Sequence, residues 1–165
     1  MKKTAFILAL ALAVSLISGC SSSAAKPKDF SKAGMTITLT EDFVEKDIIS
    51  QTAYYESMDS IVTALKEELS DFVQAGIRPD ITLMDYAEIV VAGNGFEAEI
   101  NQEQGLVYFT FDQEVNGKDF SYFATVFETD DSFWLLQFAS ETKNFEKFEP
   151  KFKEWAKSVK FDSVS

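Results

Sequence analysis

The sequence feature that most constrains the fold is a run of three aromatic-rich segments between Leu106 and Ser140. The segments read LVYFTF, FSYFATVF and SFWLLQFA, and polar turns at Asn116-Gly117 and Asp130-Asp131 separate them. Asn-Gly is the preferred pair for a two-residue type I′ turn, because both turn positions need positive φ. The pattern therefore predicts three antiparallel strands joined by short turns.

The turn positions set the expected register of these strands, and this register puts apolar side chains on both faces of the sheet. An antiparallel sheet with one face in water alternates apolar and polar residues, and this one does not. We therefore expect helices to cover both sides, or one face to bind a partner. The expected cross-strand pairs are Val115 with Lys118, Phe111 with Tyr122, Phe109 with Ala124, Val107 with Val126, Phe127 with Trp134, and Phe123 with Phe138.

Two segments have patterns of helices that would supply this cover. Thr82–Ala92 begins at a capping box of Thr82 and Asp85, and Gly93-Asn94-Gly95 provides a left-handed stop. This stop follows a helix and is too short for a dinucleotide fingerprint, so we assign it no cofactor role. Asn144–Lys157 repeats aromatic residues at spacings of three and four, with Pro150 expected in its first turn or at a kink.

The remaining segments predict further strands around this core. Met35–Thr40 alternates apolar residues with threonine, and Thr52–Ser57 is a second strand candidate. Val159-Lys160-Phe161 is expected as a short final strand or an extended tail. Ser60–Val73 is ambiguous, because its apolar residues fit a helix while Ser60–Leu65 also fits a strand paired with the preceding one. The expected class is α+β, an α/β/α sandwich with a central antiparallel sheet covered by helices on both faces.

The first thirty residues predict export and a lipid anchor. Two lysines precede an apolar run of about 13 residues, roughly 20 Å as a helix, too short to cross a bilayer core of about 30 Å. The junction Leu16-Ile17-Ser18-Gly19-Cys20 resembles the bacterial lipobox, which implies that Cys20 carries a diacylglycerol thioether. Residues 1–19 are thus the expected signal peptide, residues 20–29 a flexible tether, and residues 30–165 a single domain.

Composition removes several classes of function. The chain has no histidine, and its single cysteine is the expected lipid site. This leaves no residue for His-based triads, Cys nucleophiles, disulfides or the usual zinc, copper and haem sites. Its net charge is −12, and loss of the two signal-peptide lysines makes it −14. Such acidity opposes nucleic-acid binding and direct docking on anionic lipid. We expect no enzyme activity, no cofactor and no metal site.

The core segments together resemble a known family. GMTITLTEDF from Gly34, DYAEIV, the aromatic hairpin ending in FWLLQF and the closing WAKSVKF are similar to bacterial lipoproteins of the PsbP-like fold. That fold is shared by photosystem PsbP proteins, a nuclear Ran-binding protein, the DcrB lipoproteins and chaperones of type VI secretion effectors. The resemblance spans about residues 34–162. It implies the α/β/α sandwich and a binding or assembly role, with no active site.

Three groups of residues are candidate sites. The first is an acidic cluster after the first strand, which reads as a solvated loop or, less readily, as a hard-cation site. The second is Asp130-Asp131, interpreted as turn chemistry. The third is a set of amphipathic aromatic residues, which either pack in the core or form a contact surface. The acidic cluster contains Glu41, Asp42, Glu45 and Asp47, and the aromatic set contains Tyr54, Tyr55, Tyr108, Tyr122 and Trp134.

The function expected from these observations is that of a non-catalytic binding or assembly module. It would be held on the extracytoplasmic face of the cell membrane by the lipid on Cys20, with an envelope protein as its partner. The alternative is a carrier that holds a lipid or another small amphiphile in a groove between the sheet and a helix. A hydrolase based on carboxylates is a remote third reading, because no pair of acids stands out.

Overall fold

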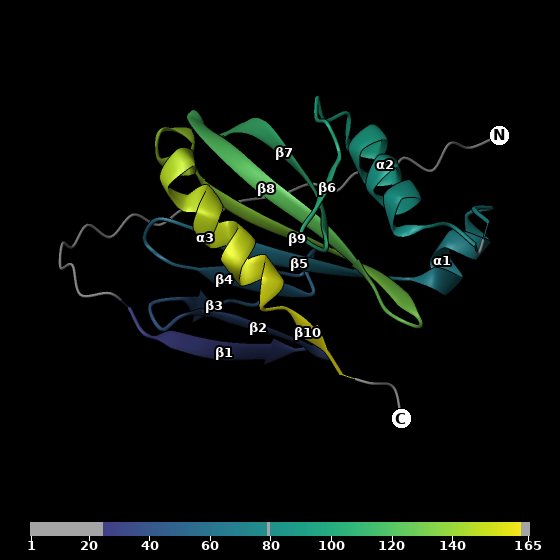
Figure 1. Cartoon of the computed structure of the whole chain (residues 1–165), viewed down its shortest axis with the longest axis horizontal. Helices are drawn as coiled ribbons and strands as arrows, with labels where there is room; N and C mark the ends of the chain where they lie inside the picture. The colour runs from purple at the N-terminus through teal and green to yellow at the C-terminus, as the bar shows by residue number, and fades with distance from the viewer. Residues whose placement is uncertain (1–24, 79, 163–165) are drawn as a thin grey trace.

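The computed structural model of the chain describes residues 25–78 and 80–162. These residues form a mixed α+β fold with two antiparallel sheets (Figure 1). The strands are β1 Pro27–Lys32, β2 Met35–Thr40, β3 Val44–Glu45, β4 Ala53–Glu56, β5 Ile61–Glu68, β6 Asn101–Glu103, β7 Leu106–Val115, β8 Lys118–Glu128, β9 Ser132–Glu141 and β10 Lys160–Phe161. The helices are α1 Leu69–Gln74, α2 Leu83–Asn94 and α3 Phe145–Lys157, with a 3₁₀ turn, η1, at Thr142–Asn144.

The larger sheet consists of two meanders joined side by side. Its seven strands have the order β3-β4-β5-β9-β8-β7-β6, and the smaller sheet has the order β1-β2-β10. Strands β3 to β5 form one meander and β6 to β9 the other, and the two meet where β5 pairs with β9 over eight residues, from Ile61 opposite Ala139 to Glu68 opposite Ser132. The chain between the meanders, which includes α1 and α2, therefore has to cross over the sheet.

The expected register of the aromatic meander is confirmed at every pair. Val115 pairs with Lys118 across Asn116-Gly117, and Phe127 pairs with Trp134 across the second turn. Asn116 has φ 53° and Gly117 has φ 77°, as a type I′ turn requires. The local turn sequence is thus sufficient to set which residues share a face. The other confirmed pairs are Phe111 with Tyr122, Phe109 with Ala124, Val107 with Val126, and Phe123 with Phe138.

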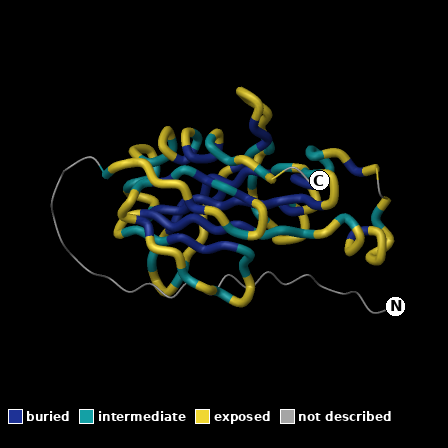
Figure 2. The backbone as a smooth tube through the Cα atoms, turned by 90° about the horizontal axis from the view of Figure 1, so that it is seen from below, coloured by how far each residue is buried: buried dark blue, intermediate teal, exposed yellow. Residues whose placement is uncertain are grey.

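The larger sheet is apolar on both faces, and each face has its own core. The first face, which we call the α2 face, includes Phe109, Phe133 and Leu135, and Tyr86 of α2 packs there. The second face, the α3 face, includes Phe123 and Phe138, and Phe152 of α3 packs on it. Figure 2 shows the buried residues concentrated along the strands between two more exposed layers.

The α2 face is covered by the crossover between the two meanders. Helix α2 begins at the expected capping box, in which Thr82 Oγ1 accepts from the Asp85 N–H at 3.1 Å and Asp85 Oδ2 accepts from the Thr82 N–H at 2.7 Å. It ends as expected at Gly95, which has φ 67° in the left-handed region. Phe96 continues the cover beyond the helix and stacks on Phe111 at a centroid distance of 3.8 Å.

The α3 face has a mixed cover, which the sequence did not predict. Helix α3 shares this layer with the small sheet, where β10 pairs with β2. Only the coarser part of the expected fold class is therefore confirmed, namely a mixed α+β fold with a large antiparallel sheet. The tether expected over residues 20–29 is wrong for Pro27–Asp29, because these residues pair with β2 through the Ala33-Gly34 turn. Cys20 and the signal peptide lie outside the described residues.

Two local uncertainties are settled by tertiary contacts. Ser60–Val73 is divided between β5 and α1, since pairing with both β4 and β9 holds Ile61–Glu68 extended. Pro150 is inside α3, in its second turn rather than its first, and a 3₁₀ turn precedes the helix. Its missing N–H removes one intrahelical bond, which the aromatic packing of the buried stripe offsets.

Replacing Trp155 with alanine should strongly destabilise the domain. The side chain is buried on α3, contacts Phe43 edge-to-face at 5.2 Å and lies 5.8 Å from Phe152. We expect Trp155→Ala to lower the free energy of unfolding by about 3–5 kcal/mol, because it leaves a large cavity. Chemical denaturation measures this, with exposed Lys151→Ala on the same helix as the control. A change below about 1 kcal/mol would contradict the packing.

Replacing Gly117 with valine should cost about 1–3 kcal/mol through backbone strain alone. A Cβ at Gly117 would have no atom within 4 Å, so steric crowding does not contribute. The matched control is Gly93→Ala inside α2, which also has open space, and which should stabilise the protein by up to about 1 kcal/mol through helix propensity. Thermal melting, with amide exchange over residues 106–127, measures both. Equal effects of the two substitutions would contradict the turn assignment.

Candidate functional site

The acidic residues after β2 do not gather into one cluster. Lys32, at the end of β1, places its Nζ 2.6 Å from Glu45 Oε1 and 2.6 Å from Asp47 Oδ1. Glu41 and Asp42 stay exposed in the preceding turn. Two of the four carboxylates are therefore joined by a lysine, and in the described part of the chain no group of three or more His, Cys, Asp or Glu side chains is placed to hold a metal ion.

This ion pair shifts the pKa values of Lys32 and Asp47. The Lys32 ammonium, through a hydrogen bond and its charge, holds the pKa of the Asp47 carboxyl below its usual range. Asp47 and then Glu45 raise the pKa of Lys32. The Asp47 side chain is 94% exposed, so solvent screens the interaction and it adds little to stability. The ion pair orders the loop after β3 but has the character of a surface contact.

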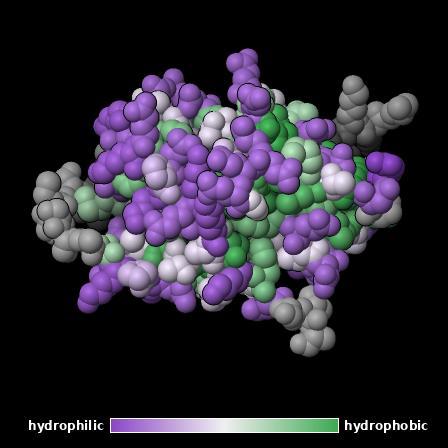
Figure 3. All heavy atoms as spheres, viewed as in Figure 1, coloured by the Kyte–Doolittle hydropathy of each residue, from purple (hydrophilic) through white to green (hydrophobic). Residues whose placement is uncertain are grey.

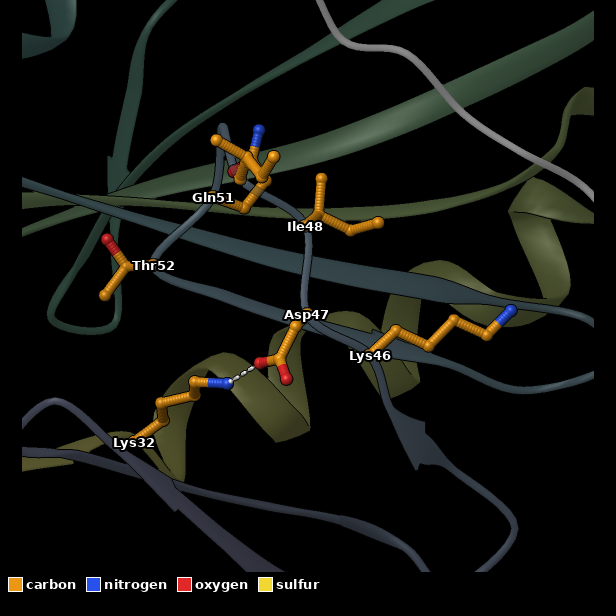
Figure 4. A pocket seen from close by; sticks show the side chains of 7 residues that line it. Lys32, Lys46, Asp47, Ile48, Gln51 and Thr52 are labelled. Carbon is orange, nitrogen blue, oxygen red and sulfur yellow. Dashed lines mark hydrogen bonds and ion pairs between the residues drawn. The ribbon is translucent and has the colours of Figure 1, made fainter.

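A pocket of about 230 Å³ opens beside this ion pair (Figure 4). Lys32 points at the Asp47 carboxylate, while the Lys46 side chain extends away and bonds Glu56 Oε1 at 2.7 Å. Both lysines are thus neutralised by carboxylates. The volume lies below the roughly 300–1,000 Å³ of usual ligand pockets, so this site suits a small polar group and not an acyl chain. Its lining residues are Lys32, Lys46, Asp47, Ile48, Ile49, Gln51 and Thr52.

The other expected site residues have structural roles. Asp131 accepts hydrogen bonds from Thr129 and Ser132 in the β8–β9 turn, as the turn interpretation predicted, and also pairs with Lys66. Four members of the aromatic set are core residues, each at most 3% exposed, and only Tyr108 is partly exposed. The aromatic set does not therefore form a contact surface. The buried four are Tyr54, Tyr55, Tyr122 and Trp134.

A different surface has the features of a contact site. Helix α2 reads LMDYAEIVVAGN, with two charges in twelve residues, and it turns only Tyr86, Ala87 and Val90 fully inward. Ile89 is 36% exposed, and Val73 of the neighbouring α1 is 51% exposed. A surface helix normally presents charged and polar residues to water. Helix α3 follows that rule, and hydrophilic side chains cover the part of the molecule where it lies (Figure 3).

The charges around α2 have one sign. Residues 67–100, which include α1 and α2, contain eight acidic residues and one basic residue, Arg78. Arg78 itself lies 3.7 Å from Asp80. The corresponding cover of the other face, residues 143–160 with α3, contains six lysines and three glutamates. We call the exposed surface of residues 67–100 the α1–α2 surface, and it is both acidic and partly apolar.

The sequence patterns revealed neither the ion pair of Lys32 nor the α1–α2 surface. Lys32 ends a strand of which Pro27–Asp29 belong to the expected tether, and its partners are 13 and 15 residues away. For α2, the signal was present as the shortage of polar residues on its outward side, but the capping box and the inward stripe explained the segment sufficiently.

Among the described residues no helix is long and apolar enough to span a membrane.

Comparison with known proteins supports the fold. No known protein family and no curated protein matches the sequence. The structure is similar to the cyanobacterial PsbP of Synechocystis, with 16% identity, a TM-score of 0.55 and coverage of 88% of this chain and 98% of that one. It is also similar to the Ran-binding protein Mog1p of Saccharomyces cerevisiae, with 11% identity, a TM-score of 0.51 and coverage of 85% and 97%.

A third similar structure is that of a mycobacterial protein. LpqN of Mycobacterium tuberculosis, described as involved in cell envelope biogenesis, has 8% identity, a TM-score of 0.50 and coverage of 85% of this chain and 92% of its own. Identities this low establish a PsbP-like fold and nothing about activity. The expected resemblance is confirmed to that extent, and membership of the DcrB lipoproteins stays a prediction.

The buried tyrosines predict a loss of stability at alkaline pH. Burial raises the pKa of Tyr55 and of Tyr122 to about 12. The pKa values of Tyr54 and Tyr86 are also raised, mainly by burial and to a smaller extent by the charge of a neighbouring glutamate. Unfolded tyrosine titrates near pH 10, so ionisation favours the unfolded chain. This stabilisation should be complete below about pH 10 and fall as the pH rises toward about 12.

Denaturation midpoints between pH 8 and pH 11, with phenolate absorbance, measure this effect. Tyr122→Phe is the control, because Tyr122 Oη has no hydrogen-bond partner among the described residues and its removal should cost little at neutral pH. The variant should lose less stability above pH 10 than the parent chain. A midpoint independent of pH up to 11 would mean that these hydroxyls reach solvent.

Proposed function

We propose that this protein is a lipid-anchored, non-catalytic binding or assembly protein of the cell envelope. The lipobox-like junction before Cys20 and the polar residues 21–26 support an anchored domain on the extracytoplasmic face. We also propose that the domain is a PsbP-like α/β/α sandwich of the type found in bacterial lipoproteins. The fold is shared with LpqN, whose description places it in envelope biogenesis.

The α1–α2 surface carries the proposal. An apolar helix face in water costs free energy, and proteins keep such faces where a partner covers them. Asp85 on this surface holds the helix cap, and outside it the shifted carboxyl groups of Asp131 and Asp47 are held in a turn and an ion pair. The chemistry available at the surface is therefore recognition of another macromolecule and not turnover of a substrate.

The carrier alternative has less support. The pocket beside Lys32 has about 230 Å³, is polar at its two lysines and Asp47, and lies beside an edge of the larger sheet, where only Ile48 of its lining packs against the α2-face core. An acyl chain needs a longer apolar cavity. Native mass spectrometry of the full-length protein, gently extracted from membranes, distinguishes the two functions. Detection of a stoichiometric protein partner would support the assembly role. Detection of a retained amphiphile without a protein partner would contradict the assembly role and support the carrier role.

The anchor itself is tested by Cys20→Ser. The thiol is the proposed attachment point, so this variant should lose incorporation of a fatty-acid analogue completely and remain as an unprocessed or released chain. The folded domain should be unaffected, and its thermal melting should match that of the parent. Met58→Ser, at an exposed position in the β4–β5 turn, is the matched control and should label normally. Label that persists on Cys20→Ser would assign the lipid to another residue.

A further inference from the structure

We infer that the α1–α2 surface binds a cationic amphipathic segment of a partner protein, and this inference rests on the proposed assembly role. Its first support is the contrast between the two covering helices. Helix α3 places its lysines and glutamates outward and no exposed large hydrophobic side chain among them, with Phe152 and Trp155 buried and Phe145 and Phe148 partly buried. Helix α2 has Ile89 exposed and Met84 and Val91 only partly buried, on either side of the outward-facing Glu88.

The apolar residues of this surface are continuous with the core beneath them. Leu69, Ile77 and Met84 pack against the α2-face core yet stay partly accessible. Phe72 and Tyr86 lie directly below, in edge-to-face contact at 5.8 Å, and Tyr86 stacks on Phe133 at 4.6 Å. A partner that covers α1 and α2 would therefore extend a rigid, well-packed layer. A preorganised surface of this kind binds with little loss of side-chain freedom.

The sign of the charge decides what covers the surface. Eight acidic residues against one basic residue in residues 67–100 give a net charge of −7, which becomes −6 when Lys66, paired with Glu68 at 2.9 Å, is included. Asp85 and Glu88 lie on the same helix as Ile89, within the Debye length of about 8 Å at physiological salt. A second copy of this chain would bring two such layers together, and like charges across an interface are unfavourable. Anionic lipid head groups are opposed for the same reason.

The dimensions of α2 indicate the form of the partner. Its twelve residues span about 18 Å, which matches three turns of a second helix. An amphipathic helix that lays its apolar stripe on a hydrophobic surface is a common recognition mode. Lysine or arginine beside that stripe would meet Asp71, Asp85 and Glu88. The partner chemistry is therefore an apolar stripe with flanking basic residues.

The test uses three synthetic peptides on the full-length protein as expressed, held in zwitterionic nanodiscs if it carries the lipid and in solution if it does not, with empty nanodiscs measured alongside. The probes are an 18-residue leucine–lysine amphipathic helix, a scrambled peptide of the same composition, and a leucine–glutamate counterpart. Fluorescence anisotropy gives affinity, and amide exchange locates the contact. We expect the first peptide to bind, to protect residues 69–77 and 83–94, and to weaken as salt rises. The other two should bind about tenfold or more weakly.

Two variants and a matched control assign the contact. Glu88→Lys and Ile89→Ser should each weaken the leucine–lysine peptide about tenfold. Glu146→Lys on α3 makes the same charge change at an exposed position and should leave the affinity unchanged. Equal weakening by Glu88→Lys and Glu146→Lys, or equal binding of the scrambled peptide, would mean plain charge attraction and overturn the inference. Protection of α2 that grows with protein concentration would assign the surface to a second copy and overturn it as well.

The partner chemistry inferred here and the proposed function can be rejected independently of each other. A protein that takes the fatty-acid label at Cys20 and has a stoichiometric partner, yet ignores all three peptides, keeps its assembly role and loses this partner chemistry. A protein that binds the peptide through α2 but takes no label loses the anchor alone.

Discussion

Burial of β9 on both faces is the constraint on which the rest of the structure depends. Every residue of β9 from Ser132 to Ser140 is buried, and the strand pairs with β5 on one side and β8 on the other. Trp134, Leu136 and Phe138 enter one core, while Phe133 and Leu135 enter the other. A strand of this kind has no stable position at an edge or against water. The protein must therefore build cover on both sides of the larger sheet.

The two covers solve this problem differently. On the α3 face, a strongly amphipathic helix and a three-stranded sheet close over the core and present charge to solvent. On the α2 face, the cover is the crossover between two meanders, which contributes a six-residue helix, a twelve-residue helix and the chain leading to β6. Both covers contain partly buried apolar residues, but the helices of the second also expose Val73 and Ile89. The difference follows from topology, because the segment between β5 and β6 has to connect the two meanders and cover the sheet at the same time.

The sequence predicts the parts of this fold that are specified within a few residues. Asn116-Gly117 set the register of nine pairs between β7 and β8, and Thr82 with Asp85 marked the start of α2, since both signals are local hydrogen-bonding or backbone requirements. The strands β2 and β10 of the small sheet were expected, but β1 and the assembly of the three into a separate sheet were not predicted, because β1 buries only Phe30 and β10 has two residues. Their pairing depends on β2 and on the position of α3, which no local pattern encodes. The ion pair of Lys32 with Glu45 and Asp47 was missed for the same reason.

The acidity of the whole chain can be interpreted only when the positions of the acidic residues in the structure are considered. A net charge of −12 is explained by solubility alone if the acids surround the molecule evenly. The two covers are not even: residues 67–100 hold eight acids and one base, whereas residues 143–160 hold six lysines and three glutamates. Solubility gives no reason for acids to concentrate on the layer whose helix also exposes Ile89. Recognition gives one, because apolar contact supplies affinity while surrounding charge selects the partner and repels another copy.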